Sequence, residues 1–279
     1  MKICIERSDR MGDMILTLPI IQGIKEKNPK ASIHVVASKK NLKICQLSNL
    51  IDKTYEKTNN SSAFKQLIKC INDEKYDYYF SFSPGWFGLL LGYYSKSKFK
   101  SALILQSRYK SNMLSKFWQI IFSKIFFSQL KVVNRFKSLK ENEDIHQTKT
   151  MMEVILNSGI SLDNNHTSNF TFKNAFTIKK DKKVCVIHLS SKLINKYYEE
   201  DNFLELLKAL EKKNLSIYLT SDETTKSKFH KIFTLYSSTD KANELINNEK
   251  QILLCNNFDF ENWTSLLNQA DYTITPESG

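Results

Sequence analysis

The sequence predicts an α/β protein with parallel β-sheets, and three observations support this fold class. Short apolar runs typical of buried strands alternate with amphipathic stretches typical of helices. The alternation occurs twice, before about residue 105 and after residue 183, and the polar segment 159–181 separates the two series. Strand–helix–strand repetition implies a parallel sheet with helices on both faces. We therefore expect two domains, one over 1–165 and one over 166–279.

The first series predicts an α/β domain that ends in helices. Its apolar runs predict strands at 2–5, 32–37, 77–82 and 101–105. Its amphipathic stretches predict helices near 14–27, 61–73 and 85–95, followed by a helix-rich stretch over 112–158.

The second series continues the same alternation to the end of the sequence. Strands are expected at 183–189, 215–220, 251–255 and 271–275, and helices at 202–213, 223–236 and 260–269. Ligands of such sheets bind at the carboxyl ends of the strands. Two domains of this kind, facing each other, would form a cleft there.

The charge of the chain indicates an anionic partner. The formal net charge is +12, which favours a nucleic acid, a membrane surface or a phosphorylated substrate. The abundance of Lys, Asn and Ile offers a second explanation, because proteins of AT-rich genomes drift toward this composition. Composition alone leaves both explanations open.

Cysteine usage and apolar runs exclude several classes. The five cysteines are far apart and form no C-x-x-C pair, so no metal site is expected, and Cys4, Cys185 and Cys255 are expected to be small buried hydrophobes. No segment approaches the ~18 uncharged apolar residues of a membrane span. Charges at Glu6 and Arg7 rule out a signal-peptide core. We expect a protein of the reducing cytoplasm.

The segment RSDRMGDMILTLP, residues 7–19, places Gly12 and Asp13 where the first strand gives way to a helix. Asp13 has two interpretations: it caps a helix that begins near residue 14, or it is a catalytic carboxylate. Gly12 would allow a tight turn and leave room for a ligand. The segment is not a dinucleotide fingerprint, because the second and third glycines of G-x-G-x-x-G are absent.

The first fifty residues resemble the start of the ADP-heptose:lipopolysaccharide heptosyltransferases, glycosyltransferase family 9. That start has a strand, R-x-x-x-x-G-D-x-apolar-x-T-L-P, a helix ending in L-K-x-x-x-P, and an apolar-Ile-Asp before the next strand. The matching residues here are Arg7, Gly12, Asp13, Thr17, Leu18, Pro19, Ile24, Lys25, Pro29, Ile51 and Asp52. The resemblance implies a GT-B fold, in which two Rossmann-like domains face a cleft.

The second half resembles the donor-binding half of the same family. Matching segments are VIHLSSKLINKYYEEDNFLELLKAL, IYLTSDE and NFDFENWTSLLNQADYTITPESG. The resemblance implies an N-terminal acceptor-side domain and a C-terminal nucleotide-sugar domain. The stretch 106–142 matches the family poorly.

By this resemblance Asp13 is the general base, and Arg7 and Gly12 lie on the acceptor side. Attack of an acceptor hydroxyl on a sugar carbon needs a carboxylate that takes the proton. A single carboxylate opposite the leaving group suits an inverting displacement, since retention would need a second one as nucleophile. One carboxylate can also cap a helix before substrate arrives, so both interpretations of Asp13 stay open.

The resemblance also implies a donor site at the ends of the second series of strands. Its residues are Ser190, Ser191, Lys196, Glu223, Glu277, Ser278 and Gly279. Lys192 competes with Lys196 for the lysine role, and Asp222 is better explained as a helix cap. No metal or other cofactor is expected, because lysine and backbone N–H groups can hold the diphosphate.

The C-terminus departs from the family pattern. Glu277 replaces an aspartate, and the sequence stops at Gly279, before the helix that would point its N–H groups at the diphosphate. We expect a C-terminal domain that lacks this helix and binds nucleotide sugars weakly.

Residues 108–137 combine an apolar helical face with a basic rim. Phe117, Trp118, Ile121, Ile125 and Phe126 can share the face, and lysines and arginines surround it. This pattern is typical of an interfacial helix on anionic lipid, although a core-facing helix with a solvated side is more common. The resemblance favours peripheral contact at the inner face of the inner membrane.

The main functional hypothesis is a metal-independent, inverting glycosyltransferase. It would move a heptose or related sugar from an ADP-heptose-like donor to a lipid-linked, phosphorylated glycan such as a lipopolysaccharide core. The alternative is an impaired homologue that only binds glycolipid or nucleotide. Nucleic-acid binding is not expected, because the sequence has no helix-turn-helix, zinc-finger or RNP-like motif.

Overall fold

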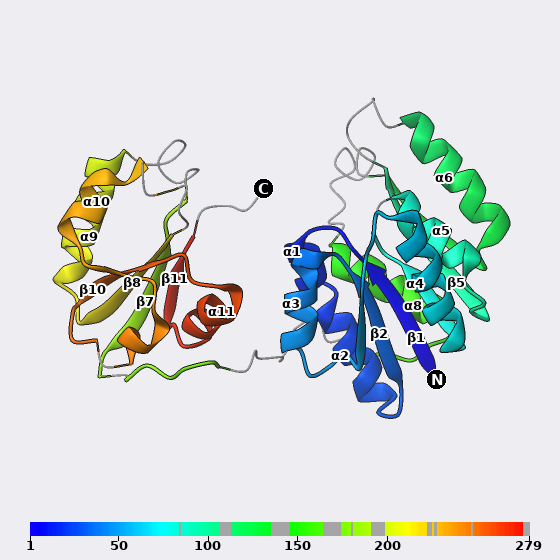
Figure 1. Ribbon diagram of the computed structural model, residues 1–279, viewed down its shortest axis with the longest axis horizontal. Helices are drawn as coiled ribbons and strands as arrows, with labels where there is room; N and C mark the ends of the chain where they lie inside the picture. The colour runs from blue at the N-terminus through cyan, green and yellow to red at the C-terminus, as the bar shows by residue number, and fades with distance from the viewer. Residues whose placement is uncertain are drawn as a thin grey trace. The chain divides into compact units, whose positions relative to one another are not determined.

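The computed structural model divides the chain into two compact units, Met1–Phe170 and Thr171–Gly279 (Figure 1). The structure describes residues 1–83, 85–106, 113–134, 146–163, 174–179, 181–190, 199–221, 225, 228–246 and 248–275. The α/β class with parallel sheets, expected from the alternation of apolar and amphipathic runs, is confirmed.

The first unit contains a six-stranded sheet in the order β3-β2-β1-β4-β5-β6, and every neighbouring pair is parallel. Its strands are β1 (Lys2–Arg7), β2 (Ser32–Ala37), β3 (Lys53–Glu56), β4 (Tyr78–Ser81), β5 (Phe99–Gln106) and β6 (Gln129–Asn134). β6 lies within the stretch expected to be helical. It is an edge strand with mostly half-buried or exposed residues, so it lacks the apolar run of a central strand.

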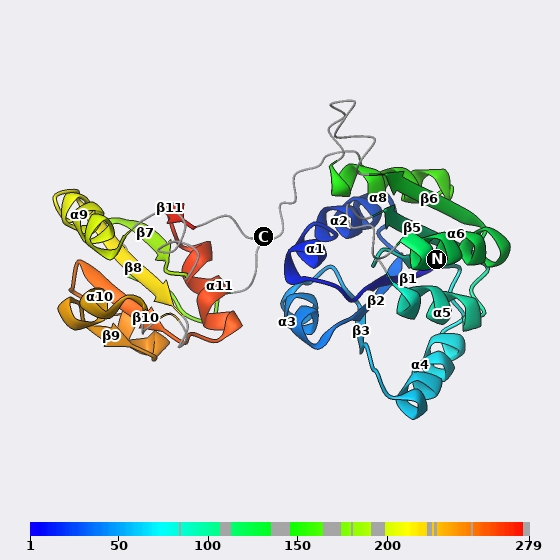
Figure 2. The same cartoon turned by 90° about the horizontal axis from the view of Figure 1, so that it is seen from above.

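Helices cover both faces of this sheet. They are α1 (Met11–Ile15), α2 (Leu18–Lys27), α3 (Lys39–Leu47), α4 (Ser61–Asp73), α5 (Trp86–Tyr94), α6 (Met113–Phe126) and α8 (Gln147–Asn157). Figure 2 shows α2 and α8 on one face and α4 and α5 on the other. On the second face, Leu67, Ile71 and Leu89 pack against Cys4 and Tyr79 of the strands.

The helix expected over 14–27 is two helices, α1 and α2. Pro19 is at the start of α2 and has no N–H to donate to the carbonyl of Ile15. Thr17 Oγ1 instead donates to the carbonyl oxygen of Asp13 over 2.9 Å. The chain therefore turns between Ile15 and Leu18, and α1 remains a short helix of five residues that carries Asp13.

The second unit contains a five-stranded parallel sheet in the order β11-β7-β8-β10-β9. Its strands are β7 (Lys183–His188), β8 (Leu215–Ser221), β9 (Ser238–Thr239), β10 (Ile252–Asn256) and β11 (Tyr272–Ile274). Its helices are α9 (Glu200–Glu211), α10 (His230–Leu235), α11 (Phe260–Asn268) and the 3₁₀ helix η4 (Ala242–Leu245). The expected helix over 223–236 is described only as α10.

The cysteines behave as the sequence predicts. Cys4, Cys185 and Cys255 are buried in the strands, and burial raises the pKa of each thiol. They act as small apolar residues of the two cores. Within the described residues, every helix is too short or too polar to cross a bilayer.

Candidate active site

The first candidate site lies at the carboxyl end of β1. β2 and β3 lie on one side of β1, and β4 follows on the other side, so the strand order reverses between β1 and β4. Parallel sheets bind ligands at such a reversal. The ends of the two strands are joined there, because the backbone N–H of Ser8 donates to Ser83 Oγ over 2.6 Å.

Arg7 is the centre of this site and its side chain is fully buried. Its Nε donates to the carbonyl oxygen of Asp13 over 3.1 Å, and its Nη1 donates to the carbonyl oxygen of Phe82. The guanidinium also forms ion pairs of 3.4 Å with Asp9 Oδ2 and with Asp13 Oδ1. Arg7 therefore holds two carboxylates and the backbone of α1 in one arrangement.

Asp13 is not the N-cap of a helix. α1 begins at Met11 with Arg10 as its N-cap, and no side chain caps it. The Asp13 carboxylate, 24% exposed, pairs with Arg7 instead. The interpretation of Asp13 as a cap for a helix beginning near residue 14 is therefore wrong, and the structure brings Asp13 together with Arg7.

Gly12 does not make the tight turn that the sequence suggested. It lies inside α1, and among the described glycines only Gly159 has a φ in the left-handed region. A Cβ built on Gly12 would meet nothing within 4 Å. The space beside Gly12 is therefore open, and this agrees with the expectation that Gly12 leaves room for a ligand.

Two further carboxylates of this site were missed by the sequence interpretation. Burial raises the pKa of Asp9 to about 7 against the opposing effect of Arg7, and the negative charge of Asp13 raises it further. Burial also raises the pKa of Glu6, which accepts hydrogen bonds from Ser8 Oγ (2.5 Å) and Ser81 Oγ (3.2 Å). The sequence signal that could have revealed a buried carboxylate here is the charged pair Glu6-Arg7, which directly follows the apolar run of the first strand.

Gly88 of α5 explains how Glu6 fits inside the unit. A Cβ on Gly88 would lie 2.2 Å from Glu6 Oε2 and 2.3 Å from Ser81 Oγ. A side chain there would displace the buried Glu6 carboxylate and the Ser81 hydroxyl that bonds it, so glycine lets α5 approach the end of β1 this closely.

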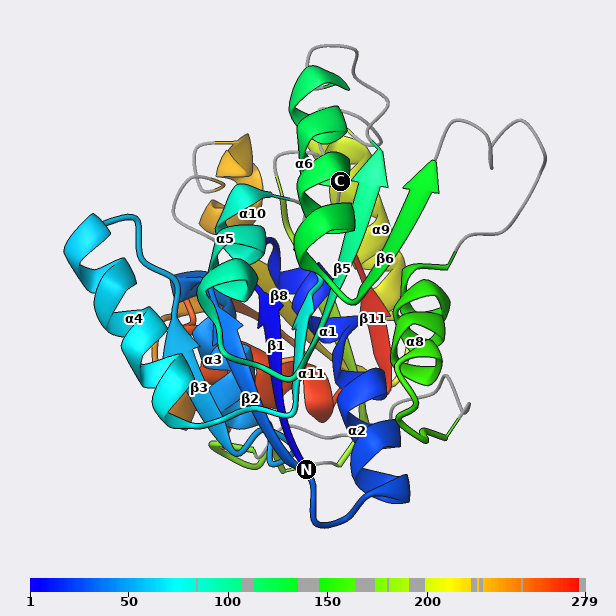
Figure 3. The same cartoon turned by 90° about the vertical axis from the view of Figure 1, so that its right-hand side faces the viewer.

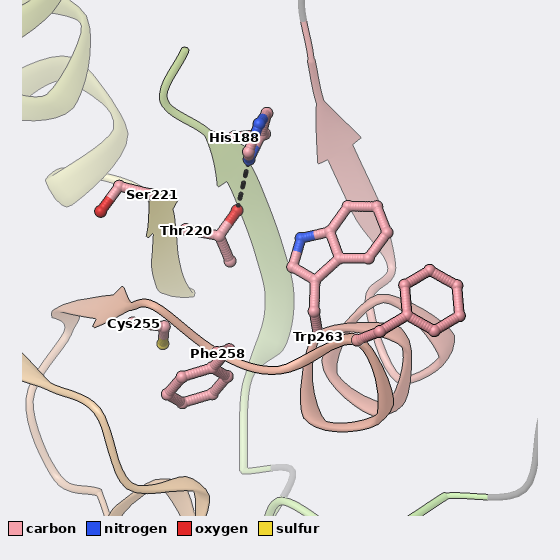
Figure 4. Close-up of a pocket in the computed structure, with 7 residues that line it drawn as sticks. His188, Thr220, Ser221, Cys255, Phe258 and Trp263 are labelled. Atoms are coloured by element: carbon pink, nitrogen blue, oxygen red, sulfur yellow. Dashed lines mark hydrogen bonds between the residues drawn. The ribbon is translucent and has the colours of Figure 1, made fainter. Parts of the chain in front are cut away.

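The second candidate site is a pocket of about 280 Å³ at the carboxyl ends of β7, β8 and β10 (Figure 4). It is lined by His188, Thr220, Ser221, Cys255, Phe258, Phe260 and Trp263. His188 Nδ1 and Thr220 Oγ1 are 3.0 Å apart. The ring centroids of His188 and Trp263 are 6.2 Å apart, and the two rings pack edge to face. The pocket joins aromatic faces to a few polar groups, as small-molecule sites do.

Of the donor residues that the sequence suggests, the structure describes Ser190. Its Oγ follows β7, is buried, and has no hydrogen-bond partner among the described residues. The other candidates lie outside the described residues: Ser191, Lys196, Glu223, Glu277, Ser278 and Gly279. The pocket aromatics were missed, because they come from separate segments that only the fold brings together.

Comparison with known proteins identifies the family. The pattern of glycosyltransferase family 9 (heptosyltransferase) matches residues 64–279. The chain belongs to this family. The resemblance seen in the sequence is thereby confirmed, and the protein is a glycosyltransferase. The match begins after α1, so the segment around Asp13 lies outside it. Comparison with curated protein sequences gave no match.

Solved structures of the family have the same fold. A family 9 glycosyltransferase from Veillonella parvula DSM 2008 superposes with a TM-score of 0.74 at 12% identity, over 99% of this chain and 75% of that one. E. coli heptosyltransferase WaaC with ADP-2-deoxy-2-fluoro heptose gives 0.69 at 13% identity, over 99% and 82%. E. coli ADP-heptose lps heptosyltransferase II gives 0.68 at 10% identity, over 100% and 80%. These likenesses confirm the expected GT-B fold with Rossmann-like units.

Proposed function

We propose that this glycosyltransferase moves a heptose or a related sugar from a nucleotide-diphosphate donor to a lipopolysaccharide core or similar glycan. The observation that carries the proposal is the Asp13 carboxylate, held by the buried Arg7 at the carboxyl edge of the first sheet. Parallel sheets bind ligands at this edge, so a base here can reach a bound substrate.

The reaction we propose is a single inverting displacement. Asp13 takes the proton of an acceptor hydroxyl while the hydroxyl oxygen attacks the anomeric carbon. The bond from that carbon to the nucleotide diphosphate breaks, and the diphosphate leaves with the electron pair. One positioned carboxylate suffices for this step. Product anomers opposite in configuration to the donor would support it, and unchanged turnover in EDTA would support metal independence.

We propose that the first domain, about 1–165, binds the acceptor and the second, about 166–279, binds the donor. The pocket of the second unit supports this division, because it offers the aromatic side chains of Phe258 and Trp263 to a base. The hydroxyl of Ser190, buried after β7 without a partner among the described residues, would turn toward a phosphate oxygen of the bound donor. The E. coli WaaC structure contains an ADP-sugar analogue, so an ADP-sugar is the donor we propose.

Replacing Trp263 with Ala should weaken ADP binding at least ~10-fold, because base–aromatic stacking is worth about 1–3 kcal/mol. NMR titration with ADP measures this even for weak binding, and the wild-type indole N–H of Trp263 should shift. Trp86→Ala is the matched control, since Trp86 lies on α5 of the other unit. Equal ADP affinity in Trp263→Ala and wild type would contradict the proposed donor pocket.

We propose that α6 contacts an anionic membrane surface that holds the acceptor. Figure 3 shows α6 alongside α5. Several large apolar side chains of α6 are exposed: Leu114 (72%), Phe117 (56%), Trp118 (54%), Ile125 (66%) and Phe126 (42%). Phe122 packs against the core, so only part of the helix faces inward. Exposed apolar residues beside Lys124 match an interfacial helix.

Replacing Phe117 and Trp118 together with Ser should lower binding to vesicles of phosphatidylglycerol and phosphatidylethanolamine about 10-fold or more, since both side chains would leave the bilayer. Co-sedimentation with vesicles measures the bound fraction. Replacing Lys39 and Lys40 of α3 with Ser is the control for charge alone. Vesicle binding that survives the first change would show that α6 is not the contact.

A further inference from the structure

The start of α8 contacts the residues that directly follow α1. Thr148 Oγ1 donates to the carbonyl oxygen of Leu16 over 3.1 Å. One turn further along α8, Met151 Sδ lies 3.8 Å from Thr17 Oγ1. Both Thr148 and Met151 are buried. The start of α8 therefore has a fixed position beside the helix that carries Asp13.

Gln147, the first residue of α8, reaches the Arg7–Asp13 ion pair. Its amide lies between a guanidinium, which can only donate, and a carboxylate, which can only accept. Only one orientation satisfies both neighbours. The amide nitrogen then donates to Asp13 Oδ1 over 3.1 Å, and the amide oxygen accepts from Arg7 Nη2.

We propose that Gln147 is a positioning residue for the reaction, one that fixes the orientation of the Asp13 carboxylate. Arg7 and Gln147 both engage Oδ1 of that carboxylate. An ion pair and a hydrogen bond to one oxygen restrict rotation about the Cβ–Cγ bond and leave Oδ2 to take the proton of the acceptor hydroxyl. This role rests on the proposed function, in which Asp13 is the base.

Gln147 also links distant parts of the unit. It comes from α8, whereas Arg7 ends β1 and Asp13 lies in α1, so three elements meet at one carboxylate oxygen. A catalytic group is most effective when such supporting bonds lock its geometry. Misplacement of a reacting group by about 1 Å can cost ~10²-fold in rate, so loss of one of the two bonds is expected to cost about 10-fold.

The test is Gln147→Glu, which keeps the shape and the acceptor toward Arg7 and, in its ionised form, cannot donate to Asp13. Turnover of ADP-heptose with a lipopolysaccharide core acceptor should fall about 10-fold in kcat, with KM changed less than about threefold. Gln22→Glu is the matched control: it makes the same change at an exposed amide of α2 that donates to Glu26 Oε1, so it should leave kcat unchanged. Equal kcat in Gln147→Glu and wild type would overturn the proposal.

A second measurement separates this proposal from the proposed function. In ¹⁵N NMR spectra, the side-chain NH₂ signal of Gln147 is identified by its loss in Gln147→Glu. Because one proton is bonded to Asp13, the signal should shift and exchange faster with water in Asp13→Ala. An unchanged signal would overturn the role of Gln147 even if the wild type is active. A changed signal in a protein that transfers no sugar would leave the contact standing and contradict the proposed function.

Discussion

Asp13→Asn should lower kcat by about 10²-fold or more, the usual effect of removing a positioned base. The amide has the size of the carboxylate but cannot take the proton of the acceptor hydroxyl. The fold and the donor affinity should not change, because asparagine keeps the shape of the side chain and Asp9 still pairs with Arg7. Steady-state transfer kinetics and the melting temperature together measure both effects.

Asp77→Asn is the matched control for this change. Asp77 accepts from the backbone N–H of Lys2 over 2.8 Å and from Lys98 Nζ over 2.7 Å, at the amino end of the sheet. Its replacement should leave kcat unchanged. If Asp13→Asn keeps full transfer activity and unfolds more easily than the wild type, Asp13 has a structural role and the assignment as base is wrong.

Arg7→Leu should destabilise the protein by about 3–5 kcal/mol, because breaking a buried ion pair leaves uncompensated charge. Asp9 and Asp13 would both lose their cation, and the carbonyl oxygens of Asp13 and Phe82 would lose their donor. Urea unfolding of the first unit measures this change. Arg10→Leu is the control, because Arg10 is exposed at the start of α1.

The loss in Arg7→Leu should depend on pH. Burial raises the pKa of Asp9 to about 7, above its ordinary value, so the folded protein holds a proton that the unfolded chain has released. The Asp9 contribution to stability therefore falls as pH rises from about 4 to about 7. Arg7 lowers the pKa of Asp9, so without Arg7 that pKa should rise further and the fall should extend to higher pH. The variant should therefore lose less stability at pH 5 than at pH 8. A loss below about 1 kcal/mol at pH 8 would contradict the role of Arg7.

The sequence predicted the parts of the fold that depend on local patterns. Buried strands such as Ser32–Ala37 are continuous apolar runs, and α4 has a clear amphipathic period, so both were found within a few residues of their true bounds. The edge strand β6 was missed, because a half-exposed strand needs no apolar run.

Residues of the candidate site could be predicted only where they lie close together in the sequence and belong to one family pattern. Arg7 and Asp13 stand six residues apart in such a pattern, and the structure pairs them. Gln147 could not be found this way, because its place beside Asp13 depends on how α8 packs against α1. The pocket around Trp263 has the same origin, since its lining comes from the ends of three strands and the start of α11.

The most direct test of the proposed function is acceptor-dependent release of ADP from ADP-heptose. Wild-type protein is mixed with ADP-heptose, with and without a lipopolysaccharide core acceptor, and the glycan is weighed by mass spectrometry. We predict that ADP appears only with acceptor, that the glycan gains one heptose, and that Asp13→Asn removes both signals. Binding of the nucleotide sugar without any mass gain in the glycan would contradict the proposal and support a homologue that only binds.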